Sequence, residues 1–310
     1  PIALRPEIKA SGDASRFSVS VTGIRSDASG FPVTFNATNI LCDVSAGTVD
    51  GTAYIGISSN TPLAIAFGYA TNSFHAATKP GDTANSGSLR VGDVAFDYTA
   101  PSTALKATFE EGALRADLSV GIPYVSYTAA DTAATNVILK ADAAGGLGTI
   151  TASAEASADL VFRDMEVANI SAIGRLPKAG PFVYEGNIAA IGATLKFGGD
   201  IAPSDRGGIR ATNYIAMAEQ PLDLTTIQKL IPELDGVEIR TKAKVSGGYF
   251  FEGGKSGGAV HLVLSEGAVD WPEKRFYASD IRLSFSLPKL PELTSDSQML
   301  RFKNLKYRRA

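Results

Sequence analysis

Residues 237–245, VEIRTKAKV, show in nine positions the pattern that much of the chain follows. Apolar or small residues stand at every second position, and charged residues stand between most of them. Because successive side chains of a β-strand point to opposite faces, this stretch predicts a strand with one apolar face and one charged face. Residues 260–264 and 281–287 also alternate, which predicts a meander of neighbouring strands that is apolar on one face.

A helix signal lies immediately before this strand, in residues 224–234, LTTIQKLIPEL. Apolar residues recur there at helical spacing, and Thr225 and Gln228 have the spacing of a capping box. Pro232 has no amide hydrogen to donate and must end or kink the helix. We therefore expect one short helix near residues 225–234.

The rest of the chain consists of strand-like runs separated by turn signals, with no regular exchange of strands and helices. That pattern excludes doubly wound folds and TIM barrels. Glu110-Glu111-Gly112 predicts a hairpin turn, and Gly247-Gly248 predicts another. Long strands are expected at residues 150–162, 167–176, 182–197 and 209–217.

These features predict an all-β, mainly antiparallel fold: an elongated, twisted, U-shaped and groove-like sheet with one short helix. Three segments are expected, at residues 1–140, 141–220 and 221–310, and they would form one continuous sheet. A closed β-sandwich with a filled core needs the same alternation and is the alternative.

Composition restricts the function. The 310 residues include 29 Lys and Arg and 32 Asp and Glu, a net charge of −3, which disfavours nucleic-acid binding. The single cysteine, Cys42, excludes an internal disulfide. No apolar run approaches the ~20 residues that span a bilayer. Residues 1–6 do not resemble a natural start, so we expect a piece of a longer protein, with any membrane anchor outside it.

No catalytic centre is predicted. Residues 254–258 match G-x-S-x-G, but a nucleophile elbow requires a helix after the serine, and a strand follows here. Neither His75 nor His261 has another metal-binding residue at ligand spacing. We expect no metal, no cofactor and no enzymatic activity.

The C-terminal quarter resembles a known family. It is similar to the AsmA-like superfamily, and in particular to the YdbH-type, TamB-related branch of bacterial intermembrane phospholipid transport proteins. The similarity lies in the helix and glycine of residues 224–236, in the strands that follow, and in residues 281–287, 290–293 and 298–302. The resemblance implies a U-shaped sheet in the periplasm, anchored in the inner membrane by the full-length protein. It also implies that phospholipid or fatty acyl chains move along an apolar groove towards the outer membrane. Inner- or outer-membrane proteins would then be partners at the ends of the groove.

Ten apolar residues are the predicted lining of that groove. They are Val237, Ile239, Val245, Val260, Leu262, Leu264, Ile281, Leu283, Phe285 and Leu287. In the alternative, these residues fill the core of a binding, adhesion or structural module that acts through loops such as residues 71–88.

Overall fold

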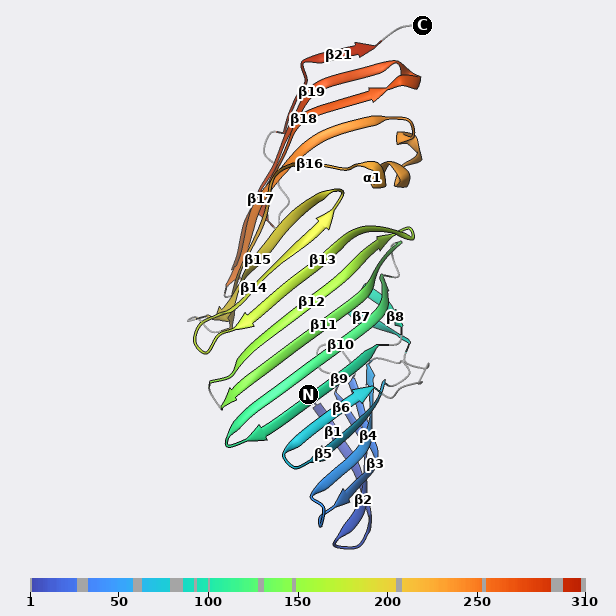
Figure 1. The fold of residues 1–310 in the computed structure, drawn as a ribbon, viewed down its shortest axis with the longest axis vertical. Helices are drawn as coiled ribbons and strands as arrows, with labels where there is room; N and C mark the ends of the chain where they lie inside the picture. The colour runs from blue at the N-terminus through green and yellow to red at the C-terminus, as the bar shows by residue number, and fades with distance from the viewer. Residues whose placement is uncertain are drawn as a thin grey trace. The chain divides into compact units, whose positions relative to one another are not determined.

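Antiparallel β-strands make up most of the computed structural model (Figure 1). The structure describes residues 2–26, 33–57, 63–78, 86–91, 94–99, 101–127, 131–146, 149–204, 208–252, 255–290 and 298–307. These residues contain 21 strands, one short α-helix and two 3-10 helices, and the sheet does not close on itself. The prediction of an open, all-β antiparallel fold with one short helix is confirmed, and the sandwich alternative is not what forms.

The chain divides into two units, and the first covers Pro1–Asp164. Its strands are β1 (Ile2–Gly12), β2 (Arg16–Ser26), β3 (Val33–Asp43), β4 (Thr48–Ile57), β5 (Leu63–Ala70), β6 (Ser73–Thr78), β7 (Gly87–Val91), β8 (Val94–Thr99), β9 (Ser102–Glu110), β10 (Ala113–Tyr127), β11 (Thr132–Gly146) and β12 (Thr151–Phe162). From β1 to β6 each strand pairs with the next; β9 then pairs with β6 and β10, followed by β11 and β12. The β7–β8 hairpin pairs through β8 with the far end of β10.

The second unit covers Met165–Ala310. Its elements are β13 (Met165–Leu176), β14 (Phe182–Ala190), β15 (Ala193–Pro203), β16 (Ile209–Pro221), α1 (Thr225–Leu230), η2 (Pro232–Leu234), β17 (Glu238–Glu252), β18 (Lys255–Trp271), η3 (Pro272–Lys274), β19 (Phe276–Leu290), β20 (Met299–Arg301) and β21 (Asn304–Tyr307). Strands β13 to β19 pair in chain order, and β20 and β21 both pair with β19 (Figure 1).

Two predicted strand boundaries are wrong. The run expected at residues 182–197 is a hairpin, because Ile191 and Gly192 both adopt positive φ and turn the chain between β14 and β15. Gly247-Gly248 does not turn the chain but lies inside β17. The turn predicted at Glu111-Gly112 is confirmed, with φ of 50° and 78°.

The helix forms where the sequence predicts it, but the capping box is wrong. The Thr225 hydroxyl and backbone amide both donate to the Asp223 carboxylate, and the N-cap residue, Leu224, makes no side-chain hydrogen bond to the helix. The side-chain amide of Gln228 donates instead to the backbone carbonyl of Val237, which connects α1 to the start of β17. Pro232 ends the α-helix and begins a 3-10 turn.

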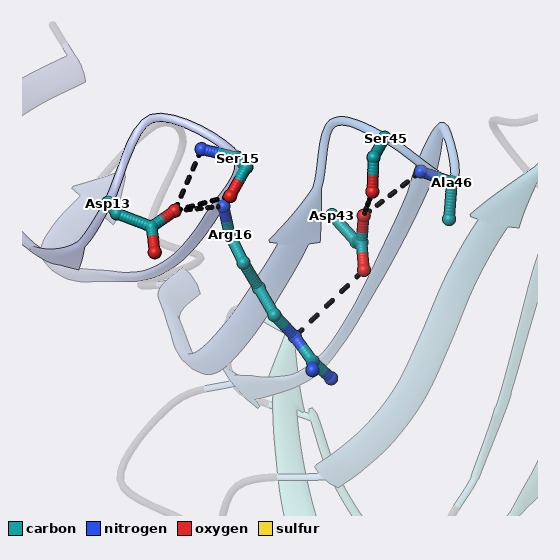
Figure 2. Close-up of polar contacts among 6 residues, drawn as sticks. All are labelled: Asp13, Ser15, Arg16, Asp43, Ser45 and Ala46. Atoms are coloured by element: carbon teal, nitrogen blue, oxygen red, sulfur yellow. Dashed lines mark hydrogen bonds and ion pairs between the residues drawn. The ribbon is translucent and has the colours of Figure 1, made fainter.

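Aspartate side chains organise two turns in the first unit (Figure 2). Asp13 Oδ1 accepts hydrogen bonds from the Ser15 amide at 2.8 Å, the Ser15 hydroxyl at 2.6 Å and the Arg16 amide at 2.8 Å. Asp43 Oδ1 accepts hydrogen bonds from the Ser45 hydroxyl at 2.7 Å and from the Ala46 backbone amide at 2.9 Å. Both turns use an Asp-x-Ser sequence, in which the carboxylate takes the place of a backbone acceptor. Hydrogen bonds from Ser15 and Ser45 lower the pKa of the respective carboxyl groups.

Several strand glycines lie beneath a ring of the neighbouring strand. Gly186 pairs with Phe197, and a Cβ at Gly186 would lie 2.4 Å from the ring. The same arrangement recurs at Gly51–Phe67, Gly68–His75, Gly198–Tyr214, Gly199–Tyr184, Gly257–Phe250 and Gly258–Tyr249. A ring that covers a cross-strand glycine supplies the packing that the glycine lacks.

Replacement of Gly186 by alanine tests this arrangement. The new methyl group would lie 2.4 Å from both the Phe197 ring and the Ser171 carbonyl oxygen, so the strands must shift. We expect the free energy of unfolding, measured by urea titration, to fall by about 1–3 kcal/mol, the usual cost of overpacking. Gly146→Ala is the control, because its Cβ would find the nearest atom at 3.5 Å. Equal losses in the two variants would contradict the interpretation.

The aspartate turns predict a stability that depends on pH. A carboxyl group whose pKa is lower in the folded than in the unfolded state stabilises the fold above the unfolded pKa, and this contribution is lost as the pH falls through the folded pKa. The free energy of unfolding should therefore decrease as the pH is lowered below about 4. In an Asp13→Asn, Asp43→Asn double variant, which keeps the acceptor oxygens but cannot titrate, urea midpoints at pH 7 and pH 3 should differ less. An unchanged difference would show that these turns do not contribute.

Candidate functional site

Nine of the ten predicted groove residues lie on three adjacent strands, and the register brings several of them into shared rows. Ile239 and Val245 lie on β17, Val260, Leu262 and Leu264 on β18, and Ile281, Leu283, Phe285 and Leu287 on β19. The register sets Val245 opposite Leu262, and Leu262 opposite Phe285. Leu264 lies opposite Leu283 in the next row. Val237 lies immediately before β17 and is buried.

This apolar face extends onto strands that the sequence analysis did not assign to the site. Met217 on β16 pairs with Val245, and Ile215 on the same strand pairs with Phe197 on β15. A small cluster of buried residues joins the sheet here: Ala193, Met217 and Ala243, against which Leu195, Leu222, Val245, Leu262 and Leu264 pack. The two-residue alternation of residues 193–197 and 213–217 could have identified these positions.

The apolar face is not covered as a protein core is. Buried apolar residues in the described chain are mostly alanines, and no large side chain there is less than 2% exposed. In the apolar rows the large side chains, such as Leu262 and Phe285, are half-buried, and Phe251 is 41% exposed. Since a filled core buries its large side chains almost completely, this face is an open apolar surface.

The opposite face of these strands is charged. Glu238, Arg240 and Lys244 alternate with the apolar positions of β17 and are exposed. Lys242 Nζ forms an ion pair with Glu266 at 2.7 Å, and this interaction raises the pKa of the lysine. One face of the sheet is therefore suited to water and the other to an apolar partner.

The first unit has the same two faces. Leu118 on β10 lies between Leu105 on β9 and Ala141 on β11. The row continues to Ala76 on β6 and Ala154 on β12, so five strands contribute apolar side chains to it. The adjacent row on the other face consists of His75, Lys106, Asp117, Asp142 and Ser153. A hollow of about 800 Å³ is lined by this charged row and also by Ala76, Leu105, Leu118 and Ala141 of the apolar row.

Polar side chains of Tyr184 and Asn213 interrupt the apolar face in the second unit. The Tyr184 hydroxyl donates to Asn213 Oδ1, and Asn213 Nδ2 donates to the Tyr249 carbonyl at 3.4 Å. Burial, and secondarily the negative charge of Asp200, raise the pKa of Tyr184, so this phenol stays neutral at physiological pH. The polar groups of Tyr184 and Asn213 are thus hydrogen-bonded within the sheet, and the face around them is apolar.

The described residues offer little for catalysis. His261 Nδ1 and Ser286 Oγ lie 2.9 Å apart on the polar face. No described carboxylate bonds to this imidazole, although a Ser–His nucleophile needs an orienting group. Ser256 lies within β18 opposite Phe251, so the G-x-S-x-G sequence does not form a nucleophile elbow.

Among the residues that the structure describes, no three His, Cys, Asp or Glu side chains gather where they could hold a metal ion. No helix in the same residues is long and apolar enough to cross a bilayer.

Comparisons of the chain with known protein families, with curated proteins and with solved structures found no match. Function is therefore inferred from the two faces of the sheet and from the sequence resemblance.

Truncation of Leu262 distinguishes an open face from a filled core. Leu→Ala in a filled core typically costs about 2–5 kcal/mol. Because Leu262 is half-buried, we expect Leu262→Ala to lower the free energy of unfolding by less than about 2 kcal/mol in a urea titration. A loss at the upper end of the core range would show that the face is covered in solution.

Proposed function

We propose that the protein is a non-enzymatic lipid-transfer conduit of the bacterial cell envelope, along which the acyl chains of phospholipids or fatty acids move on the apolar face of the sheet. The observation that carries the proposal is the row of large apolar side chains that continues from strand to strand, in which Met217 is buried and Val245, Leu262 and Phe285 are half-buried. Exposed apolar surfaces of this kind mark sites of interaction with apolar partners.

The chemistry of the face suits acyl chains better than peptides or sugars. Its residues are aliphatic and aromatic, and the Tyr184 and Asn213 polar groups on it are bonded to each other. Transfer of each methylene from water is worth ~0.8 kcal/mol, so a chain of about 16 carbons with half its surface covered would gain about 6 kcal/mol before ordering costs. Such binding holds a lipid and still allows it to move.

The conduit would require a place between two membranes. The resemblance to the YdbH-type branch supports a periplasmic location, with the full-length protein anchored in the inner membrane and membrane proteins as partners at the ends of the sheet. The charged face, represented by Arg240 and Lys244, supports contact with water on the side away from the lipid.

Native mass spectrometry with lipid extraction tests the proposal on the chain purified from a bacterial host. We expect co-purifying phospholipid that is released on unfolding. Leu262→Asp should abolish this capture, because the charge enters the apolar row, whereas Val263→Asp, on the opposite face and 40% exposed in the wild type, should retain it.

Circular dichroism of both variants shows whether the sheet is intact, and Val260→Ser supplies a milder change on the apolar face if Leu262→Asp does not fold. A wild-type protein that stays free of lipid after incubation with liposomes would refute the proposal. Equal lipid capture by Leu262→Asp and Val263→Asp would also refute it.

A further inference from the structure

The last strands of the second unit place two arginines side by side. Strand β20 pairs with β19 in a register that sets Arg301 directly opposite Arg282. Like charges directly opposite one another destabilise a strand pair. A bound anion would remove this cost, whereas nothing in the pairing itself does.

The charges around this pair are not balanced. Asp280 Oδ2 lies 2.6 Å from Lys303 Nζ, and Asp280 Oδ1 lies 3.5 Å from Arg282 Nε. Arg301 forms no ion pair with any residue that the structure describes. The hollow region therefore holds three cationic side chains and one carboxylate, and only Arg282 and Lys303 pair with that carboxylate.

The same residues line a hollow. It has a volume of about 440 Å³ and is lined by Asp280, Arg282, Leu300, Arg301, Phe302 and Lys303. That volume has room for a phosphate group together with part of a larger molecule. Guanidinium groups bind phosphate through two parallel hydrogen bonds, which makes arginine pairs well suited to it.

Apolar side chains stand out from the same edge. Leu300 is 61% exposed, Phe302 52% and Tyr307 69%, and Met299 and Leu305 are also exposed. Cationic residues beside exposed aromatic and aliphatic ones are characteristic of surfaces that contact a bilayer, because the apolar groups enter the interface while the cations meet the head groups.

We propose that the edge formed by β20, β21 and the facing part of β19 binds the phosphate of anionic lipid head groups at a membrane surface. The charge excess attracts the head group, and the exposed Leu300 and Phe302 supply the apolar contact. Arg282 and Arg301 lie on the face opposite to Leu283 and Leu300, so binding of the head group can be tested separately from the proposed transfer of acyl chains.

Vesicle flotation tests this contact. The whole chain is mixed with vesicles of phosphatidylcholine alone or of phosphatidylcholine with about one third phosphatidylglycerol. We expect partition into the anionic vesicles that decreases with added salt. The Arg282→Gln, Arg301→Gln double variant should bind these vesicles about 30-fold more weakly, since each cation near an anionic surface contributes about fivefold.

The matched control is Arg175→Gln with Lys196→Gln, which removes two exposed charges from other strands of the same unit. It should bind like the wild type.

Equal losses in the two double variants would overturn the proposal, because they would indicate attraction by net charge alone. Binding of inorganic phosphate without partition into anionic vesicles would overturn it as well, by assigning the cluster to a soluble anion. Partition that persists in Phe302→Ser but fails in the arginine variant would assign the contact to the head group.

Discussion

The structure depends on one constraint: the described strands belong to one open sheet, so a strand is held mainly by the strands with which it pairs. In such a sheet the unit of stabilisation is the cross-strand pair. The rings over glycines, such as Phe197 over Gly186, show how the sequence meets this constraint. Each ring packs against a neighbouring backbone where a layered protein would use a second sheet, and the glycine provides the space for it.

The same constraint explains why the two faces differ. With no second sheet packed on them, apolar side chains bury their surface mainly against one another, and most of the large ones remain half-buried. Alanines such as Ala243 become buried because their larger neighbours extend past them. The result is an apolar surface that is ordered by the sheet yet accessible, together with a charged surface that keeps the chain compatible with water. This geometry supports the proposed lipid-binding role, which would need no catalytic group.

Much of this could be predicted from the sequence because strand faces depend on a period of two residues, which is directly readable. The face that carries Leu262 and Phe285 was identified in this way. Turns were harder: Ile191 adopts a positive φ, which is rare for a β-branched residue, so Gly192 alone marked the hairpin between β14 and β15. Glycines mislead for a related reason, since Gly247 serves packing and not a turn.

Contacts between strands required the structure. The facing of Arg282 and Arg301 depends on register, and a shift of one residue would move either side chain to the other face. The Gln228 bond to the Val237 carbonyl likewise could not be distinguished from a capping box by spacing, because both use the same residue type at the same position. Composition and periodicity predict which side chains share a face of the sheet. Which side chains lie opposite one another on neighbouring strands depends on the registers that the whole chain adopts.

The order of the strands has a consequence for how the protein folds. From β13 to β19 every strand pairs with the strand that follows it in the chain, as Figure 1 shows. Each added strand closes only a short loop, so the sheet can nucleate at one hairpin and grow outward, in the manner of a linear array of repeats. A sheet built in this way can also lose strands from an end while its middle stays folded. The thermodynamic stability of the sheet then varies along the chain, and a single melting temperature would not describe it.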